Sequence, residues 1–213
     1  MEAEEIKSPR ERLIVYIDGF NLYHGLHDEY GRAMLWLDLV KLSQALRPNQ
    51  LLVSVKFFTA PVLNEPEAQG RQAHYIHALQ SLYPQQFQVV NGRYQTKTMT
   101  CRSCSHTYLK YEEKETDVNI AVSLVADTAL KKMDTAIIIS ADSDLAPAIR
   151  SSRGISEELF IAVAFPPRRF SSELKKLLPS SFKIGENKIR QNQLENEFSA
   201  NGHSFQRPEK WAR

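Results

Sequence analysis

Three aspartates stand where carboxylates from distant parts of the chain could share one hard cation. Asp142 and Asp144 directly follow the apolar run 135–141, and Asp18 ends the apolar run 13–18. Both runs have strand length and are rich in β-branched residues, so each predicts a strand covered on both faces. Ligands of such parallel sheets lie outside the carboxyl ends of the strands. We therefore expect these carboxylates to meet at one edge, where their like charges need a cation between them.

A fourth acid, Asp117, falls in the first turn of a helix predicted over residues 116–130, where the helix N-terminus favours an anion. Three or four carboxylates at one edge would bind Mg²⁺ or Mn²⁺, which prefer oxygen ligands and keep several waters. Such a metal lowers the pKa of a bound water and neutralises charge on a phosphodiester. The alternative is that Asp142 and Asp144 are ordinary loop acids. The combination of all four acids favours the metal site.

Polar side chains near these acids have two interpretations each. The amide of Asn21 could orient a metal-bound water or a phosphate oxygen, or it could cap the helix that follows. Ser140 and Ser143 flank the acids and could hydrogen-bond the carboxylates and so orient them. Plain turn residues would look the same. These three residues are therefore candidates for supporting the acids and for contacting a substrate.

The elements that must position these residues alternate between strands and helices. Strands are predicted over 13–18, 51–59, 87–94, 135–141, 158–165 and 181–184, and helices over 22–30, 36–46, 68–82, 116–130, 145–152 and 171–178. This alternation predicts an α/β protein with a mainly parallel sheet of five to six strands and right-handed crossovers. The pattern of helix 116–130 is apolar on two sides, so we expect it to be largely buried. The loop after the first strand lacks the glycine pattern of a dinucleotide site.

Length and composition indicate one main domain. The 213 residues are 42% hydrophobic and carry a formal net charge of +2. We expect a charged lead-in over 1–11, a domain over 12–185 and a polar, partly disordered tail over 186–213 with one helical piece. No apolar run is long enough to span a bilayer, and the N-terminus has no apolar signal region. With two cysteines three apart, these features favour a cytoplasmic protein without a membrane partner.

Three motifs occur in order at suitable distances. They are Asp18-Gly-x-Asn21 after an apolar strand, Lys114-x-x-Asp117 opening a helix, and Ser140-x-Asp142-x-Asp144 after a later strand. On these residues the chain resembles the NYN domain, a family of the PIN-like metal-dependent nucleases, over about residues 12–184. The resemblance implies a Rossmann-like three-layer sandwich with an acidic pocket, and RNA cleavage with Mg²⁺ or Mn²⁺. It also implies that Asp18, Asp117, Asp142 and Asp144 bind the metal, with Asn21 supporting them.

The segment 95–114 is predicted to be an insertion and contains a possible zinc knuckle. Cys101 and Cys104 form a C-x-x-C, and His106 follows two residues later. A structural zinc usually needs four protein ligands, and a second cysteine pair is missing. His106 could supply a third ligand and a second subunit the rest, so a homodimer stays open. The alternative is a solvent-facing hairpin with free thiols, and we predict little or no bound zinc.

Basic residues near the acids are candidates for contacting RNA. Arg168 and Arg169 follow the predicted strand 158–165, whose loop should adjoin the acids after 135–141. Lys114 could approach a scissile phosphate. Phosphate contacts from Lys and Arg set the affinity for single-stranded or structured RNA. An ordinary solvated surface is the alternative for each cluster.

Two functional hypotheses follow from the sequence. The first is a metal-dependent ribonuclease that hydrolyses RNA phosphodiester bonds and leaves a 3′-OH and a 5′-phosphate. The second is a catalytically silent RNA- or nucleotide-binding regulatory protein with the same fold. A phosphatase is disfavoured because position 20 is Phe, which removes the usual Asp-x-Asp after the first strand.

Overall fold

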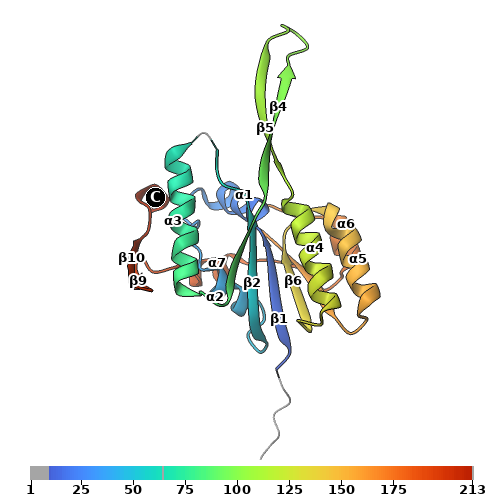
Figure 1. The fold of residues 1–213 in the computed structure, drawn as a ribbon. Helices are drawn as coiled ribbons and strands as arrows, with labels where there is room; N and C mark the ends of the chain where they lie inside the picture. The colour runs from blue at the N-terminus through green and yellow to red at the C-terminus, as the bar shows by residue number, and fades with distance from the viewer. Residues whose placement is uncertain (1–9, 64, 213) are drawn as a thin grey trace, which may run out of the picture.

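A six-stranded parallel sheet forms the centre of the protein (Figure 1). The computed structural model describes residues 10–63 and 65–212, with the side chains of 110–113 not described. The strands, in their order across the sheet, are β3 (Phe87–Asn91), β2 (Leu51–Thr59), β1 (Arg12–Asp18), β6 (Thr135–Ile139), β7 (Phe160–Phe165) and β8 (Phe182–Lys183). Each neighbouring pair is parallel. The predicted α/β class and sheet are confirmed.

Helices cover both faces of this sheet and make three layers. One layer holds α1 (Gly19–Tyr30), α2 (Leu39–Leu46), α3 (Pro66–Leu82) and α7 (Glu186–Gln191), and the other holds α4 (Thr116–Ala129), α5 (Ala146–Ile155) and α6 (Ser172–Leu177). Side chains of β1 alternate between the two layers: Leu13 and Ile17 pack with the first, Ile14 and Tyr16 with the second. Because both faces are covered, the strand is an unbroken apolar run rather than an alternating one.

The pairing of β1 with β6 positions the candidate acids. The two strands run parallel with Ile17 opposite Ile139. The next residues along each strand are Asp18 and Ser140, so both leave the sheet at the same edge. The short 3₁₀ helix η1 (Ser143–Leu145) follows β6, and α1 follows β1 directly. Residues 122 positions apart in the chain therefore become neighbours.

Helix α4 is less buried than its sequence indicates. Ile120 and Leu124 are buried against the sheet, whereas Val118 and Val122 are 62% and 61% exposed. The prediction of a largely buried helix is wrong because the helix has two apolar stripes and only one of them faces the sheet. The other stripe faces solvent.

The C-terminal segment is ordered in the structure. It contains α7, β9 (Glu197–Ala200), β10 (His203–Gln206) and the 3₁₀ helix η2 (Glu209–Trp211). Phe205 and Trp211 are buried, and Trp211 contacts Trp36, with ring centroids 6.2 Å apart. The predicted partly disordered tail is therefore wrong for residues 186–212. The segment is polar overall, which favours disorder, but it contains a few aromatic side chains. These bury enough apolar surface to hold the segment against the helical layer that contains α1, α2 and α3.

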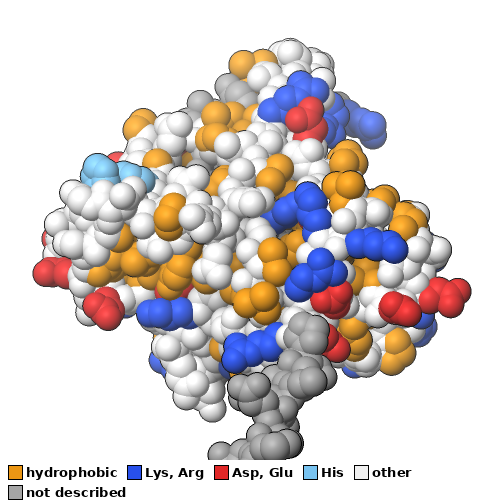
Figure 2. All heavy atoms as spheres, turned by 60° about the horizontal axis from the view of Figure 1, so that its bottom comes forward, with side chains coloured by type: hydrophobic (Ala, Val, Ile, Leu, Met, Phe, Trp, Pro, Cys, Tyr) orange, Lys and Arg blue, Asp and Glu red, His pale blue; other side chains and the backbone are white. Residues whose placement is uncertain are grey.

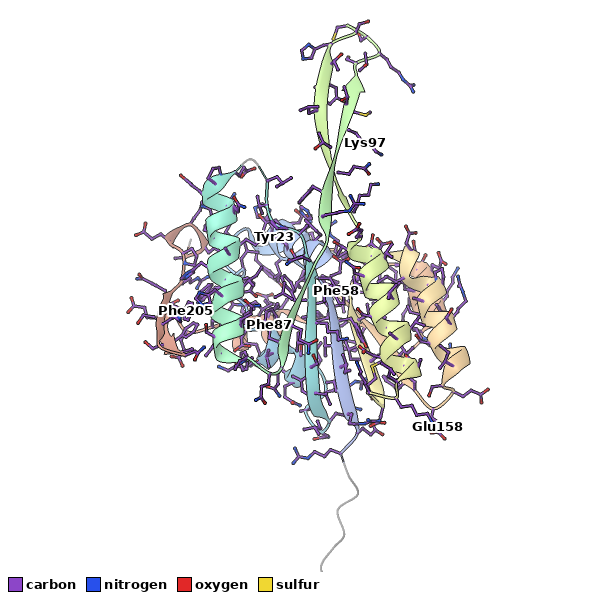
Figure 3. The ribbon with its side chains drawn as sticks, in the orientation of Figure 1. Tyr23, Phe58, Phe87, Lys97, Glu158 and Phe205 are labelled. Carbon is purple, nitrogen blue, oxygen red and sulfur yellow. The ribbon has the colours of Figure 1, made fainter. Side chains whose placement is uncertain are left out.

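A two-stranded hairpin projects from the edge of the body at which the candidate acids lie. It is formed by β4 (Arg93–Thr100) and β5 (Thr107–Lys114), antiparallel along their whole length. Figure 3 shows Lys97 on this arm, well away from the helices. The predicted strand 87–94 is split at residue 92 because its first part joins the sheet and its second part begins the arm. The predicted lead-in 1–11 falls largely outside the described residues.

No helix within the described residues is long and apolar enough to cross a membrane. The face turned forward in Figure 2, at the amino ends of the strands, shows Lys and Arg side chains interspersed with acidic and apolar ones. This mixture agrees with the nearly balanced net charge. The acids considered below belong to the other end of the sheet, where the strands finish.

Candidate active site at the carboxyl edge of β1 and β6

Asp18 is held in one orientation by three neutral donors. Its Oδ1 accepts a hydrogen bond from the backbone N–H of Asn21 at 2.9 Å, which makes Asp18 the N-cap of α1. Its Oδ2 accepts from Asn21 Nδ2 at 2.8 Å and from Ser140 Oγ at 2.9 Å. Asp18 is only 2% exposed. The sequence offered Asn21 as a possible helix cap; the structure gives that role to Asp18.

The loop after β6 is tied to the same group. Ser140 Oγ accepts a hydrogen bond from the N–H of Asp142 at 3.1 Å, and the N–H of Ala141 donates to Asn21 Oδ1 at 3.2 Å. Asp142 in turn caps η1, since its Oδ1 accepts from the N–H of Asp144 at 2.9 Å. The starts of α1 and η1 are thus joined into one network. We call the set Asp18, Asn21, Ser140 and Asp142 the acid network.

The charge in the acid network is not balanced by a described basic side chain. Burial raises the pKa of Asp18 above its ordinary value, and the nearby charge of Asp142 raises it further. The hydrogen bonds from Asn21 and Ser140 act in the opposite direction and only partly compensate. A cation beside both carboxylates would remove this cost. The electrostatics of the site therefore favour a positive ligand.

The metal-ligand set predicted from the sequence is only partly assembled. Asp117 lies in the first turn of α4 and is partly exposed, and Asp144 is exposed. Among the residues described, no group of three or more His, Cys, Asp or Glu side chains is placed to hold a metal ion. The structure brings together Asp18 and Asp142. This pair fits Mg²⁺, which is commonly held by one or two carboxylates and keeps most of its waters.

Ser140 is fully buried, so it orients Asp18 rather than contacting a substrate. The sequence placed it among possible substrate contacts, and that part of the prediction is wrong because the hydroxyl is used inside the protein. Ser143 opens η1 and is partly exposed, so a substrate contact by Ser143 stays a prediction.

The predicted RNA-binding arginines are engaged with acids of α1. Arg168 Nε lies 2.5 Å from Glu29, and Arg169 lies 2.5 Å from Asp28. These pairs hold the loop after β7 against the second half of α1 and reduce the charge available to a phosphate. Lys114 ends the hairpin arm just before α4. Contacts of these three basic residues with RNA stay predictions.

The C-x-x-C lies at the tip of the hairpin arm. The N–H of Cys101 donates to the carbonyl of His106 at 2.8 Å, which closes the turn. Cys101 and Cys104 are free thiols, and backbone N–H groups of Cys104 and Ser103 lower the pKa of Cys101. With His106 they form no three-ligand group in the part of the chain that the structure describes. A zinc site within one chain gains no support from this geometry.

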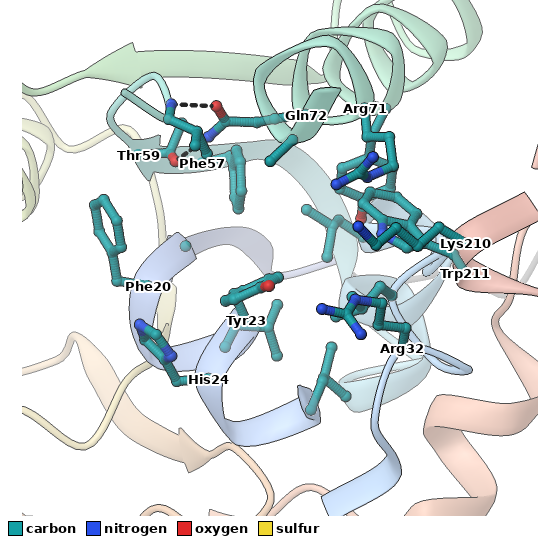
Figure 4. A pocket seen from close by; sticks show the side chains of 18 of the residues that line it. Phe20, Tyr23, His24, Arg32, Phe57, Thr59, Arg71, Gln72, Lys210 and Trp211 are labelled. Carbon is teal, nitrogen blue, oxygen red and sulfur yellow. Dashed lines mark hydrogen bonds between the residues drawn. The ribbon is translucent and has the colours of Figure 1, made fainter. Parts of the chain in front are cut away.

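Sequence reasoning missed a cavity beside α1. It lies between α1, α3 and η2, with Tyr23 and Trp211 in its wall and Arg32, Arg71 and Lys210 around it (Figure 4). Two of these residues, Lys210 and Trp211, fall in the segment predicted as a disordered tail. The aromatic residues of that segment were the available signal, since disordered tails contain few of them.

Comparison with known proteins agrees with this fold. The model of the NYN domain matches residues 12–183. A curated relative is the 6-hydroxy-3-succinoylpyridine 3-monooxygenase HspA of Pseudomonas putida, 29% identical over 175 residues. That match covers 67% of this chain and 55% of the relative, so this chain spans about half the length of that protein.

A solved structure shares the fold. It is the crystal structure of a protein of unknown function from Vibrio parahaemolyticus, with a TM-score of 0.54 and 19% sequence identity. The likeness covers 88% of this chain and 98% of that one. With the family match over most of its length, and with the ordered aspartate motifs at the edge of its parallel sheet, this chain belongs to the NYN domain family.

Proposed function

We propose that this protein is a metal-dependent ribonuclease that hydrolyses RNA phosphodiester bonds at the acid network. The observation that carries the proposal is the buried Asp18 carboxylate beside Asp142, with neutral donors around it and a raised pKa. A buried carboxyl with a raised pKa and no basic partner among the described residues is more typical of a functional site than of a structural one. Membership of the NYN domain family, which is nuclease-like, supports the same chemistry.

Each residue of the acid network has a role in this proposal. Asp18 and Asp142 would hold Mg²⁺ or Mn²⁺, and Asn21 and Ser140 keep Asp18 fixed in orientation. When bound, the cation lowers the pKa of a coordinated water and neutralises charge on the phosphate. Asp117, in the first turn of α4, and Asp144, in η1, are the further candidate metal ligands predicted from the sequence. Ser143, Lys114, Arg168 and Arg169 are the proposed contacts to RNA phosphates.

The test is RNA cleavage by wild type and by Asp142→Asn, with single-stranded and structured RNA in Mg²⁺, in Mn²⁺ and in EDTA. The substitution keeps the Oδ1 that accepts from Asp144, so the turn after β6 should survive. Glu158→Gln is the matched control, because it is the same kind of change at an exposed site far from the acid network (Figure 3). Full activity in Asp142→Asn would remove that residue from the mechanism.

A second candidate function is RNA or nucleotide binding without catalysis. The observation that favours it is that Asp18 already accepts three hydrogen bonds from the protein, while the described residues offer no three-ligand metal group. This function predicts salt-dependent RNA binding and no RNA cleavage in any divalent metal. The same cleavage assay, run beside a gel-shift titration, separates the two functions.

A further inference from the structure

The cavity beside α1 has the size of a small-molecule site. Its volume is about 320 Å³, at the lower end of the range typical of small-molecule pockets. Gly19 and Phe20 contribute to its wall, and both follow Asp18 directly in the chain. The cavity therefore adjoins the acid network but is lined by other side chains.

Its inner wall is apolar and partly aromatic. Phe57, Tyr75 and Trp211 are each at most 8% exposed, and leucines from α1 and α2 complete the apolar wall. Tyr23 is 43% exposed, and its ring stacks on His27 with centroids 5.8 Å apart. Figure 4 shows the rings of Tyr23, Phe57 and Trp211 around an open space. Flat aromatic walls of this kind favour a flat, apolar ligand body.

Basic side chains from three separate segments gather on one side of this space. Arg32 follows α1, Arg71 belongs to α3, and Lys210 belongs to η2 (Figure 4). Arg71 is 3.5 Å from Glu67, an exposed acid one turn earlier, and the lining includes the acid Glu65. Within the described residues Arg32 and Lys210 have no ion-pair partner. Glu65 and Glu67 offset two of the three positive charges, so this side keeps a net positive charge that attracts an anion.

The buried polar groups of the wall are already used by the protein. Gln72 accepts from the N–H of Val62 and donates to Thr59 Oγ1 and to the carbonyl of Ala60. The hydroxyl of Tyr75 donates to the carbonyl of Leu37. These bonds shape the loop after β2 and the start of α2. Polar recognition is thus concentrated at the basic side, and the remaining wall suits apolar atoms.

We propose that this cavity binds a small planar aromatic carboxylate. The ring packs between Tyr23, Phe57 and Trp211, and the carboxylate lies toward Arg32, Arg71 and Lys210. Arginine suits this role because its planar guanidinium pairs with a carboxylate through two parallel hydrogen bonds. A mononucleotide carries an anion as well, but its ribose hydroxyls and base edges would meet a wall whose polar groups already have partners. A free aromatic acid matches both halves of the cavity.

The experiment is calorimetric titration of the full chain in EDTA, so that the acid network is kept free of metal. The probes are benzoate, 4-hydroxybenzoate and 3-phenylpropanoate. The amide 3-phenylpropanamide is the uncharged analogue of the last of these, and uridine monophosphate represents the mononucleotides. We expect at least one carboxylate to bind, and the amide to bind at least about tenfold more weakly. Arg32→Ala and Arg71→Ala should each weaken carboxylate binding about tenfold, and Tyr23→Ala should weaken it as well.

Arg150→Ala, an exposed arginine of α5 outside the cavity lining, is the control and should leave the affinity unchanged. The titration contains neither metal nor RNA, and no residue of the acid network lines the cavity, so failure of the ribonuclease proposal would leave this result intact. Three findings would each overturn the site: no binding of any carboxylate up to about 10 mM, equal affinity for acid and amide, or tighter binding of uridine monophosphate.

Discussion

Two buried aspartates of this protein, Asp18 and Asp127, have opposite surroundings. Both are 2% exposed. Asp127, on α4, accepts a hydrogen bond from Tyr16 and forms ion pairs with Lys56 and Lys132. Burial alone would raise the pKa of Asp127, but hydrogen bonds from Lys56 and Tyr16 and the charge of Lys56 lower it overall. Asp18 has neutral donors and a second carboxylate, and its pKa is raised.

We infer from this difference that Asp127 has a structural role and that Asp18 is the candidate for a functional one. The protein balances Asp127 internally, so that carboxylate joins α4 to the sheet and needs nothing from outside. Asp18 has no such basic partner among the described residues, so burial disfavours its charged form, and a bound cation would stabilise that form. A buried acid with its own lysines is a structural feature, and a buried acid without them is the candidate for binding a cation.

The largest loss of stability is expected when Asp127 loses one of its lysine partners. Lys56→Met removes the more buried partner of Asp127 and leaves a charge in the core with only the half-exposed Lys132. Removing one partner of a buried pair typically costs about 3–5 kcal/mol of unfolding free energy. Urea unfolding measures it, with the exposed Lys176→Met as control. A loss below about 1 kcal/mol would show that this pair behaves like an exposed one.

The next largest effect is expected from Gly19→Ala, which should disturb the acid network and the cavity together. A Cβ at Gly19 would lie 2.7 Å from the carbonyl oxygen of Phe58 and 2.9 Å from the ring of Phe57. Gly19→Ala therefore has to push the first turn of α1 away from β2, at a cost of about 1–3 kcal/mol. We expect RNA cleavage and carboxylate binding both to fall.

Gly70→Ala is the matched control for Gly19→Ala. Gly70 lies within α3, and a Cβ there meets nothing within 4 Å. Because alanine is the better helix former, that variant should gain up to about 1 kcal/mol. If Gly19→Ala behaved like Gly70→Ala, the close packing of α1 on β2 would not control either site.

The two aspartates should respond to pH in opposite directions. The folded-state pKa of Asp127 is lowered, so its stabilisation is complete above the unfolded value of about 3.9 and is lost as pH falls through the folded value. The folded-state pKa of Asp18 is raised, so stability falls as pH rises from about 3.9 through its folded value. Carboxyl NMR titration measures both.

The same titration in Mg²⁺ distinguishes the two groups further. A cation at the acid network favours the ionised carboxylate, so Mg²⁺ should lower the pKa of Asp18 and leave Asp127 unchanged. An Asp18 titration that does not respond to Mg²⁺ or Mn²⁺ would argue against a metal there.

The smallest effect concerns stability of the acid network itself. Asp142→Asn removes the negative charge that raises the pKa of Asp18. The folded protein should gain less than about 1 kcal/mol at neutral pH, and the pKa of Asp18 should move toward its ordinary value. Asp144→Asn, at an exposed position, is the comparison and should leave the Asp18 titration nearly unchanged. An unchanged Asp18 pKa in Asp142→Asn would mean that the two carboxylates do not interact.

The sheet and the start of the site were predictable from local patterns. Apolar runs of strand length ending at Asp18 and before Asp142 predict both strands, and the alternation of elements predicts a mainly parallel sheet. The direct pairing of β1 with β6 is given by the structure. The sequence also indicated that Asn21 supports the acids and that Ser140 could hydrogen-bond a carboxylate, without saying which one. Their hydrogen bonds to Asp18 agree with that indication.

The features that could not be predicted from the sequence depend on contacts between distant segments. The exposed stripe of α4 and its buried partner stripe have similar composition, so only packing shows which one faces the sheet. Lys56 in a strand and Asp127 in a helix each look like ordinary surface charges until the fold brings them together. The cavity needs Trp211 to pack beside α1, and nothing local to that residue indicates its partner.

Cleavage of RNA by matched proteins gives the most direct answer about the acid network. The assay compares wild type, Asp142→Asn and Glu158→Gln in Mg²⁺, Mn²⁺ and EDTA, with unfolding curves recorded for each. The ribonuclease proposal predicts cleavage by wild type and Glu158→Gln with divalent metal, none in EDTA, and a loss of at least about 100-fold in a fully folded Asp142→Asn. Equal cleavage by Asp142→Asn, or no cleavage by wild type in either metal, would contradict it.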